Sequence, residues 1–68
     1  MKLANNLKRC RFDKDDISQE TLANAVGVSR QTIISIEKGK FIPSTMLALK
    51  IAAFFNKTVE EIFFVIKD

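Results

Sequence analysis

The stretch QETLANAVGVSRQTIISIEK, from Gln19 to Lys38, has apolar residues at helical spacing on both sides of a central glycine, Gly27. Residues three and four apart lie on one face of a helix, so the pattern predicts two short helices that bury these side chains. Gly27 suits the end of the first helix, because helices commonly end at a residue with positive φ. The apolar side chains expected in the core are Leu22, Ala23, Val26, Val28, Ile33 and Ile36.

Serines mark where both predicted helices begin. Ser18 and Ser29 can each cap the helix that follows, and Gly39 can end the second helix. About three residues, Gly27 to Ser29, then remain between the two helices. A turn this tight makes the helices cross at a steep angle, which is helix-turn-helix geometry. The sequence therefore predicts a helix-turn-helix unit over about residues 18–38.

Another helix is expected before this unit, from Asn5 to Phe12. Leu7 and Cys10 fall on one face of it with Phe12 beside them, and Leu3 continues the series toward the N-terminus. Cys10 is the one cysteine of the chain, so neither an internal disulfide nor a thiolate metal cluster is expected. We interpret Cys10 as a small buried apolar residue.

Two further helices are expected after the unit. A fourth helix is predicted over residues 44–56, and a fifth begins at Thr58, which has the spacing of a capping box with Glu61. The fifth helix is expected to include Phe63. The tail FFVIKD is rich in residues that favour strands, so it could leave the helix as a short β-strand.

The predicted fold class is therefore all-α: a single five-helix domain over residues 1–68, whose C-terminus could add a short β-strand. A chain of 68 residues buries only about 60% of the surface that its unfolded form exposes, so a partner subunit would add stability. Eleven Lys and Arg against eight Asp and Glu give a net charge of +3, which permits binding to a polyanion.

Several classes of function are disfavoured by the composition. The chain has no histidine, no pair of carboxylates in an apolar setting and no Gly-rich phosphate loop, so an enzyme is not expected, and neither is a metal or a cofactor. No apolar run has the length of a signal peptide or a membrane span. We therefore expect a cytoplasmic protein that does not bind membranes.

Three stretches, ISQETLANAVGVSRQTIISIEKGKFIPS, LALKIAAFF and TVEEIF, together resemble the Cro and phage-repressor type of helix-turn-helix regulators, also called the XRE-like family. The resemblance covers almost the whole chain and is closest to the small stand-alone members. It implies a lambda-repressor-like domain of five helices that binds operator DNA as a homodimer.

The resemblance also implies roles for single positions. The expected base readers on the third helix are Arg30, Gln31, Ser35 and Ile34. The expected phosphate contacts are Gln19, Ser29, Lys38 and Lys40. Arg11 and Glu37 resemble a family pair that joins the first helix to the recognition helix.

These roles have simpler competitors. An arginine can donate two hydrogen bonds to guanine and a glutamine fits adenine, but Arg30 and Gln31 could also be ordinary solvated helix residues. Ser35 is short for a contact with a base. Ile34 could touch a thymine methyl group or simply cover the flank of the helix.

For the homodimer, we expect a contact built from the C-terminal segment with a residue near the N-terminus: Ile62, Phe64, Val65, Ile66 and Leu3. These residues could instead close the core of the monomer, or Met46 and Phe54 could make the dimer.

The function predicted from the sequence is that of a transcriptional regulator, in particular a repressor, which binds a palindromic operator in double-stranded DNA with its third helix in the major groove. The alternative is an antitoxin-like or protein-interaction module that keeps the fold and binds an unknown partner protein. The basic residues around the third helix argue against this alternative. RNA binding is disfavoured, because no RNA-specific motif is present.

Overall fold

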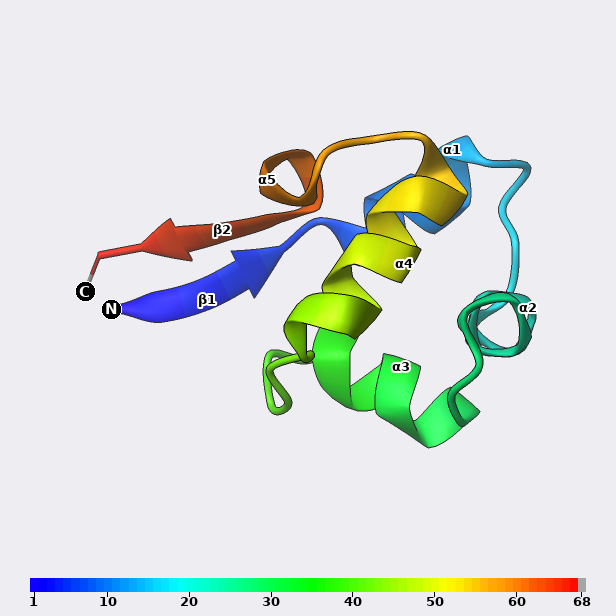
Figure 1. Ribbon diagram of the computed structural model, residues 1–68, viewed down its shortest axis with the longest axis horizontal. Helices are drawn as coiled ribbons and strands as arrows, with labels where there is room; N and C mark the ends of the chain where they lie inside the picture. The colour runs from blue at the N-terminus through cyan, green and yellow to red at the C-terminus, as the bar shows by residue number, and fades with distance from the viewer. Residues whose placement is uncertain (68) are drawn as a thin grey trace.

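The computed structural model describes residues 1–67 and has five helices between two short strands (Figure 1). In chain order the elements are β1 (Lys2–Asn5), α1 (Leu7–Asp13), α2 (Gln19–Val26), α3 (Arg30–Glu37), α4 (Thr45–Phe55), α5 (Val59–Ile62) and β2 (Phe63–Ile66). The prediction of a mostly helical, lambda-repressor-like domain with five helices is confirmed, as is the strand at the C-terminus.

Serine hydroxyls cap three of the helices. Ser18, Ser29 and Ser44 each accept a hydrogen bond from the backbone amide three residues later, at the starts of α2, α3 and α4. A cap of this kind contributes about 1 kcal/mol, because it satisfies an amide that has no partner inside the helix. The beginnings of the two helices of the helix-turn-helix unit are therefore encoded locally.

The predicted capping box at α5 is also present. The Thr58 hydroxyl accepts from the Glu61 amide, and the Glu61 carboxylate accepts from the Thr58 amide at 2.8 Å. The hydrogen bond from the Thr58 backbone is the main reason that the pKa of Glu61 lies below its usual value. A helix of four residues is short for its own stability, so these two bonds help to define where it begins.

The helices enclose one apolar core. Six of its side chains are fully or almost fully buried: Leu7, Leu22, Ile33, Ile36, Ile51 and Ile62. Cys10 is 4% exposed, as expected for a small apolar residue, and burial raises the pKa of its thiol. All buried residues in the described part of the chain are apolar, so its charged side chains lie at the edge of the core or outside it.

The two strands form an antiparallel pair that extends away from the helices, with the N-terminus and the end of β2 at its tip (Figure 1). Leu3 pairs with Val65 and Ala4 with Phe64. We call this pair, β1 (Lys2–Asn5) with β2 (Phe63–Ile66), the β arm. The C-terminal strand therefore pairs with a strand of its own chain. This N-terminal strand, β1, was not predicted.

Four local expectations were wrong, three of them because residues expected in or along a helix belong to the β arm. Helix α1 begins at Leu7 and not at Asn5, because Asn5 belongs to β1 and its side chain accepts a hydrogen bond from the Leu7 amide. Leu3 lies in β1 and not on a helical face, and Phe63 belongs to β2 and not to α5. Phe12 is 61% exposed, so it lies outside the core.

Gly27 ends α2 in the left-handed conformation, with φ of 77°. A Cβ atom at this position would meet nothing within 4 Å, so the cost of a side chain would come from the backbone conformation. We predict that Gly27→Val lowers the free energy of unfolding by about 1–3 kcal/mol, because a β-branched residue is strained at positive φ.

Thermal or urea unfolding measures this change. Ala25→Val is the matched control, since it introduces the same β-branched side chain at an exposed position inside α2 and should cost less than about 1 kcal/mol. Equal losses in the two variants would show that the turn does not depend on glycine.

Candidate nucleic-acid interface

Helix α3 packs against the core through its two buried isoleucines, Ile33 and Ile36. This orientation leaves Arg30 and Gln31 exposed on the first turn, next to the turn that follows α2. Ile34 and Ser35 are half-buried. The predicted base readers therefore share one helix, but the two residues of the first turn are the accessible ones.

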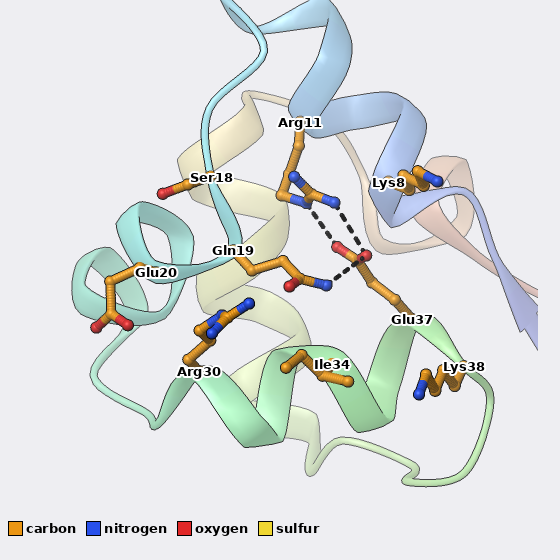
Figure 2. Close-up of a pocket in the computed structure, with 9 residues that line it drawn as sticks. All are labelled: Lys8, Arg11, Ser18, Gln19, Glu20, Arg30, Ile34, Glu37 and Lys38. Carbon is orange, nitrogen blue, oxygen red and sulfur yellow. Dashed lines mark hydrogen bonds and ion pairs between the residues drawn. The ribbon is translucent and has the colours of Figure 1, made fainter.

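A groove runs between α3, the beginning of α2 and α1 (Figure 2). Its lining includes four cationic side chains, which come from α1, from α3 and from the residue directly after α3, together with the apolar side chain of Ile34. The lining residues are Lys8, Arg11, Ser18, Gln19, Glu20, Arg30, Ile34, Glu37 and Lys38. The groove therefore places positive charge beside the exposed face of α3.

Lys8 was not among the residues predicted for this site. It lies three positions before Arg11 in α1, so the two side chains share a face of that helix and line the same groove. The spacing was a signal available in the sequence. This spacing identifies Lys8 as a groove residue only once α1 and α3 are known to border the same groove.

Arg11 and Glu37 form an ion pair across the groove (Figure 2). Arg11 Nε donates to Glu37 Oε2 at 2.6 Å and Nη2 donates to Oε1 at 3.1 Å, while Nη1 donates to the carbonyl oxygen of Ile17 at 2.9 Å. The side chains of Arg11 and Glu37 are 12% and 9% exposed. The bonds to Glu37 raise the pKa of Arg11 above its usual value.

Gln19 shares this carboxylate, since its Nε2 donates to Glu37 Oε1 at 3.2 Å. An amide nitrogen carries two hydrogens, so one donor of Gln19 remains for a ligand in the groove. Glu37 therefore binds side chains from both α1 and α2, and it fixes the direction of the residue expected to contact a phosphate.

The other expected phosphate contacts differ in their surroundings. The Ser29 hydroxyl caps α3 by accepting from the Thr32 amide at 3.2 Å, so it is already engaged. Lys38 is exposed and lines the groove. Lys40 is exposed beyond Gly39, and its backbone amide donates to Ser35. The two lysines thus extend the positive charge past the end of α3.

The residues expected at a dimer contact differ in how exposed they are. Ile62 is fully buried in the core of its own chain, so we remove it from the expected contact. Leu3 is half-buried against that core. Phe64, Val65 and Ile66 are 42%, 57% and 44% exposed, all on the β arm.

Of the two residues that could make the dimer instead, Met46 is 65% exposed. Phe54 is half-buried, where its ring packs edge-on against Phe55 and lies under the Lys14 ammonium group.

Two helices joined by a tight glycine turn, with an exposed polar face beside a cationic groove, define a DNA-binding domain of the helix-turn-helix class. Comparison with known proteins agrees. A helix-turn-helix family model matches residues 7–62. The chain belongs to the Cro-type, or XRE-like, family of helix-turn-helix transcriptional regulators.

Similar proteins occur in archaea and bacteria. An uncharacterized HTH-type transcriptional regulator of Methanocaldococcus jannaschii is 60% identical over 48 residues, which cover 71% of this chain and 73% of the relative. The uncharacterized regulator YgzD of Bacillus subtilis is 50% identical over 55 residues, 81% and 79% of the two chains. The control protein C.MunI of a Mycoplasma species is 36% identical over 63 residues, 93% and 85% of the two chains.

The protein is accordingly a DNA-binding transcriptional regulator, of a family without enzymatic activity. Within residues 1–67, no helix is both long enough and apolar enough to cross a membrane.

The ion pair gives a prediction about stability. Arg11→Met would leave the Glu37 carboxylate nearly buried without its arginine, so we expect a loss of about 3–5 kcal/mol in the free energy of unfolding. The double variant Arg11→Met, Glu37→Leu should be clearly more stable than the single variant, because no charge is then left unpaired.

Urea unfolding compares these variants. Arg9→Met is the matched control: Arg9 pairs with Asp13 on the same helix but its side chain is 72% exposed, so its loss should cost less than about 1 kcal/mol. Similar stabilities for Arg9→Met and Arg11→Met would contradict a bracing role for the pair.

Proposed function

We propose that this regulator recognises a palindromic operator as a homodimer, with α3 of each subunit in the major groove, and that it represses the promoter it occupies. The observation that carries the proposal is the exposed first turn of α3, with Arg30 and Gln31, beside a groove that holds cations from α1 and α3. A dimer is the expected solution, because one short helix contacts too few base pairs for useful specificity.

In this proposal Arg30 and Gln31 read the bases. Both are exposed at the N-terminal end of α3, the end that meets base edges in proteins of this class. Arginine fits guanine and glutamine fits adenine, each with two hydrogen bonds. Ile34 and Ser35 are half-buried, so we assign them a secondary part, in which Ile34 makes an apolar contact with a thymine methyl group.

The phosphate contacts surround this face. We propose Lys38, Lys40 and the remaining donor of Gln19 as side-chain contacts, and we add Lys8, because it lines the groove from α1. Ser29 would contribute through its backbone, since its hydroxyl caps α3. These contacts would orient the domain on the duplex without reading its sequence.

The β arm is the surface that we propose for the dimer. Three consecutive apolar residues of β2 are exposed there, and a two-stranded sheet is only marginally stable by itself in water. Leu3 lines one groove with Ile42 and Ile66 and another with Leu49, so the apolar surface continues onto α4. A second copy that covers this surface would add the burial that a 68-residue core lacks.

The relatives support a regulatory role. One of them is described as a control protein and the others as transcriptional regulators. Repression follows most simply from a domain that excludes other proteins from the DNA it covers, and a cytoplasmic location follows from the DNA target. A promoter fused to a reporter gene, with and without the regulator, tests the sign of regulation.

The base readers can be tested by substitution. We predict that Arg30→Ala and Gln31→Ala each weaken binding to the operator by about 1–3 kcal/mol and have little effect on random DNA. Lys40→Ala should weaken both kinds of binding equally and reduce the slope of log K against log salt by about 1. Fluorescence anisotropy with selected and random duplexes measures these constants.

Lys57→Ala is the control for loss of positive charge. Lys57 is exposed in the connection between α4 and α5. This connection lies on the other side of the helical body from α3 (Figure 1), so loss of Lys57 should leave both affinities almost unchanged. An operator preference that survived in Arg30→Ala and Gln31→Ala would show that the reading face is wrong. A wild-type protein with no preference among duplexes would favour the protein-interaction alternative.

The dimer surface gives a separate prediction. Phe64→Ser should shift the protein toward the monomer, because it removes an exposed ring from the β arm. Phe12→Ser is the matched control, since Phe12 is exposed on α1 and outside the proposed contact. Sedimentation analysis at micromolar concentration measures the masses. A Phe64→Ser variant that stayed dimeric and folded would rule out the β arm as the contact.

A further inference from the structure

Asn5 lies where the β arm, α1 and α3 meet. Its Nδ2 donates to the carbonyl oxygen of Ile36 at 2.9 Å, and its Oδ1 accepts from the amide of Leu7 at 3.0 Å. Its backbone pairs with Phe63 in the last register position of the arm. One side chain thus connects a strand, the first turn of one helix and the last turn of another.

The carbonyl of Ile36 is well suited to this connection. It lies in the last turn of α3, where carbonyl oxygens lack a partner further along the helix, and it also accepts from Gly39 at 2.9 Å. The second lone pair is taken by Asn5. The base of the arm is tied to α5 as well, because the Asn6 amide donates to Ile62 at 3.0 Å. The bond from Asn5 is therefore a direct link between the arm and the recognition helix.

We infer that Asn5 is a positioning residue that sets the angle between the β arm and α3, and through that angle the half-site spacing that the dimer accepts. This inference rests on the proposed dimer contact at the β arm. If the arm joins two subunits, the direction of each α3 relative to its arm decides how far apart the two recognition helices lie. The bond from Asn5 to Ile36 fixes this direction.

Small rotations at this joint are large on the scale of DNA. The molecule is 32 Å long. A rotation of about 12° moves a point at half of that length by about 3.4 Å, which is the rise of one base pair. Both subunits would rotate, so a joint without its side-chain bond should tolerate a spacing that differs by one base pair.

The side-chain chemistry allows the two bonds of Asn5 to be separated. Asn5→Asp keeps an oxygen that can accept from Leu7 but replaces the donor to Ile36 with an oxygen that faces the carbonyl. A carboxylate before α1 is favourable for the helix dipole, so the start of α1 should survive. Asn5→Ser is a second, uncharged variant, whose hydroxyl is too short to span to Ile36. Asn6→Ala is the control, because it changes the neighbouring exposed residue and keeps the bond.

The experiment uses half-sites selected from random duplex DNA by the wild-type protein, joined at the selected spacing and at spacings one and two base pairs longer or shorter. We expect the wild-type protein and Asn6→Ala to prefer one spacing by about 10-fold or more. Asn5→Asp and Asn5→Ser should lose most of this preference or move it by one base pair, while their affinity for an isolated half-site stays within about 2-fold of the wild type.

The possible failures can be told apart. A wild-type protein that binds all spacings equally would overturn the proposed dimer, and the inference with it, before any variant is made. A wild-type preference that both Asn5 variants retain would overturn the inference alone. If thermal unfolding showed that both variants had lost their folded structure, Asn5 would be a folding residue and the inference would be wrong.

Discussion

The bidentate ion pair between Arg11 and Glu37 holds the recognition helix against the rest of the domain. Arg11 lies in α1 and also binds the carbonyl of Ile17, so the guanidinium connects α1, the segment before α2 and the end of α3. Removing two charges from water is costly, so such a pair contributes less to net stability than its short distances suggest. Its geometry is specific, because the planar fork of arginine fits a carboxylate in few orientations. We interpret the pair as a device that selects one orientation of α3.

The need for such a device follows from the size of the chain. A core of this size is filled by short helices, and apolar contacts have no direction, so burial of Ile33 and Ile36 does not by itself fix how α3 is rotated and tilted. Glu37 adds direction at the last residue of α3, and it also draws Gln19 from α2 into the same cluster. The two helices of the unit are therefore joined at the turn by Gly27 and across the groove by a carboxylate.

Much of the fold could be predicted from the sequence, because its signals are local. The caps at Ser18 and Ser29, the positive φ at Gly27 and the capping box at Thr58 depend on residues at most three positions apart. Such features are encoded where they occur.

The missed features depend on partners far away in the sequence. Strand β1 has four residues, and its partner lies about sixty positions later, so no periodic pattern identified it. Ile62 was expected at a dimer contact because it is apolar and close to the C-terminus, but the position of α5 buries it in the core. Lys8 is a groove residue only because α1 and α3 border the same groove.

The polar contacts that hold α3 are unevenly distributed along its length. The side-chain hydrogen bonds from other elements reach its last two residues: Asn5 binds the carbonyl of Ile36, and Arg11 and Gln19 bind the carboxylate of Glu37. At the other end, Ser29 caps the helix within its own segment, and Arg30 and Gln31 are exposed. A helix held at its C-terminal end keeps its direction, while long side chains at its N-terminal end can still change rotamer to meet a base edge. The base-reading end is thus the part of α3 that can adapt without loss of the contacts that orient the helix.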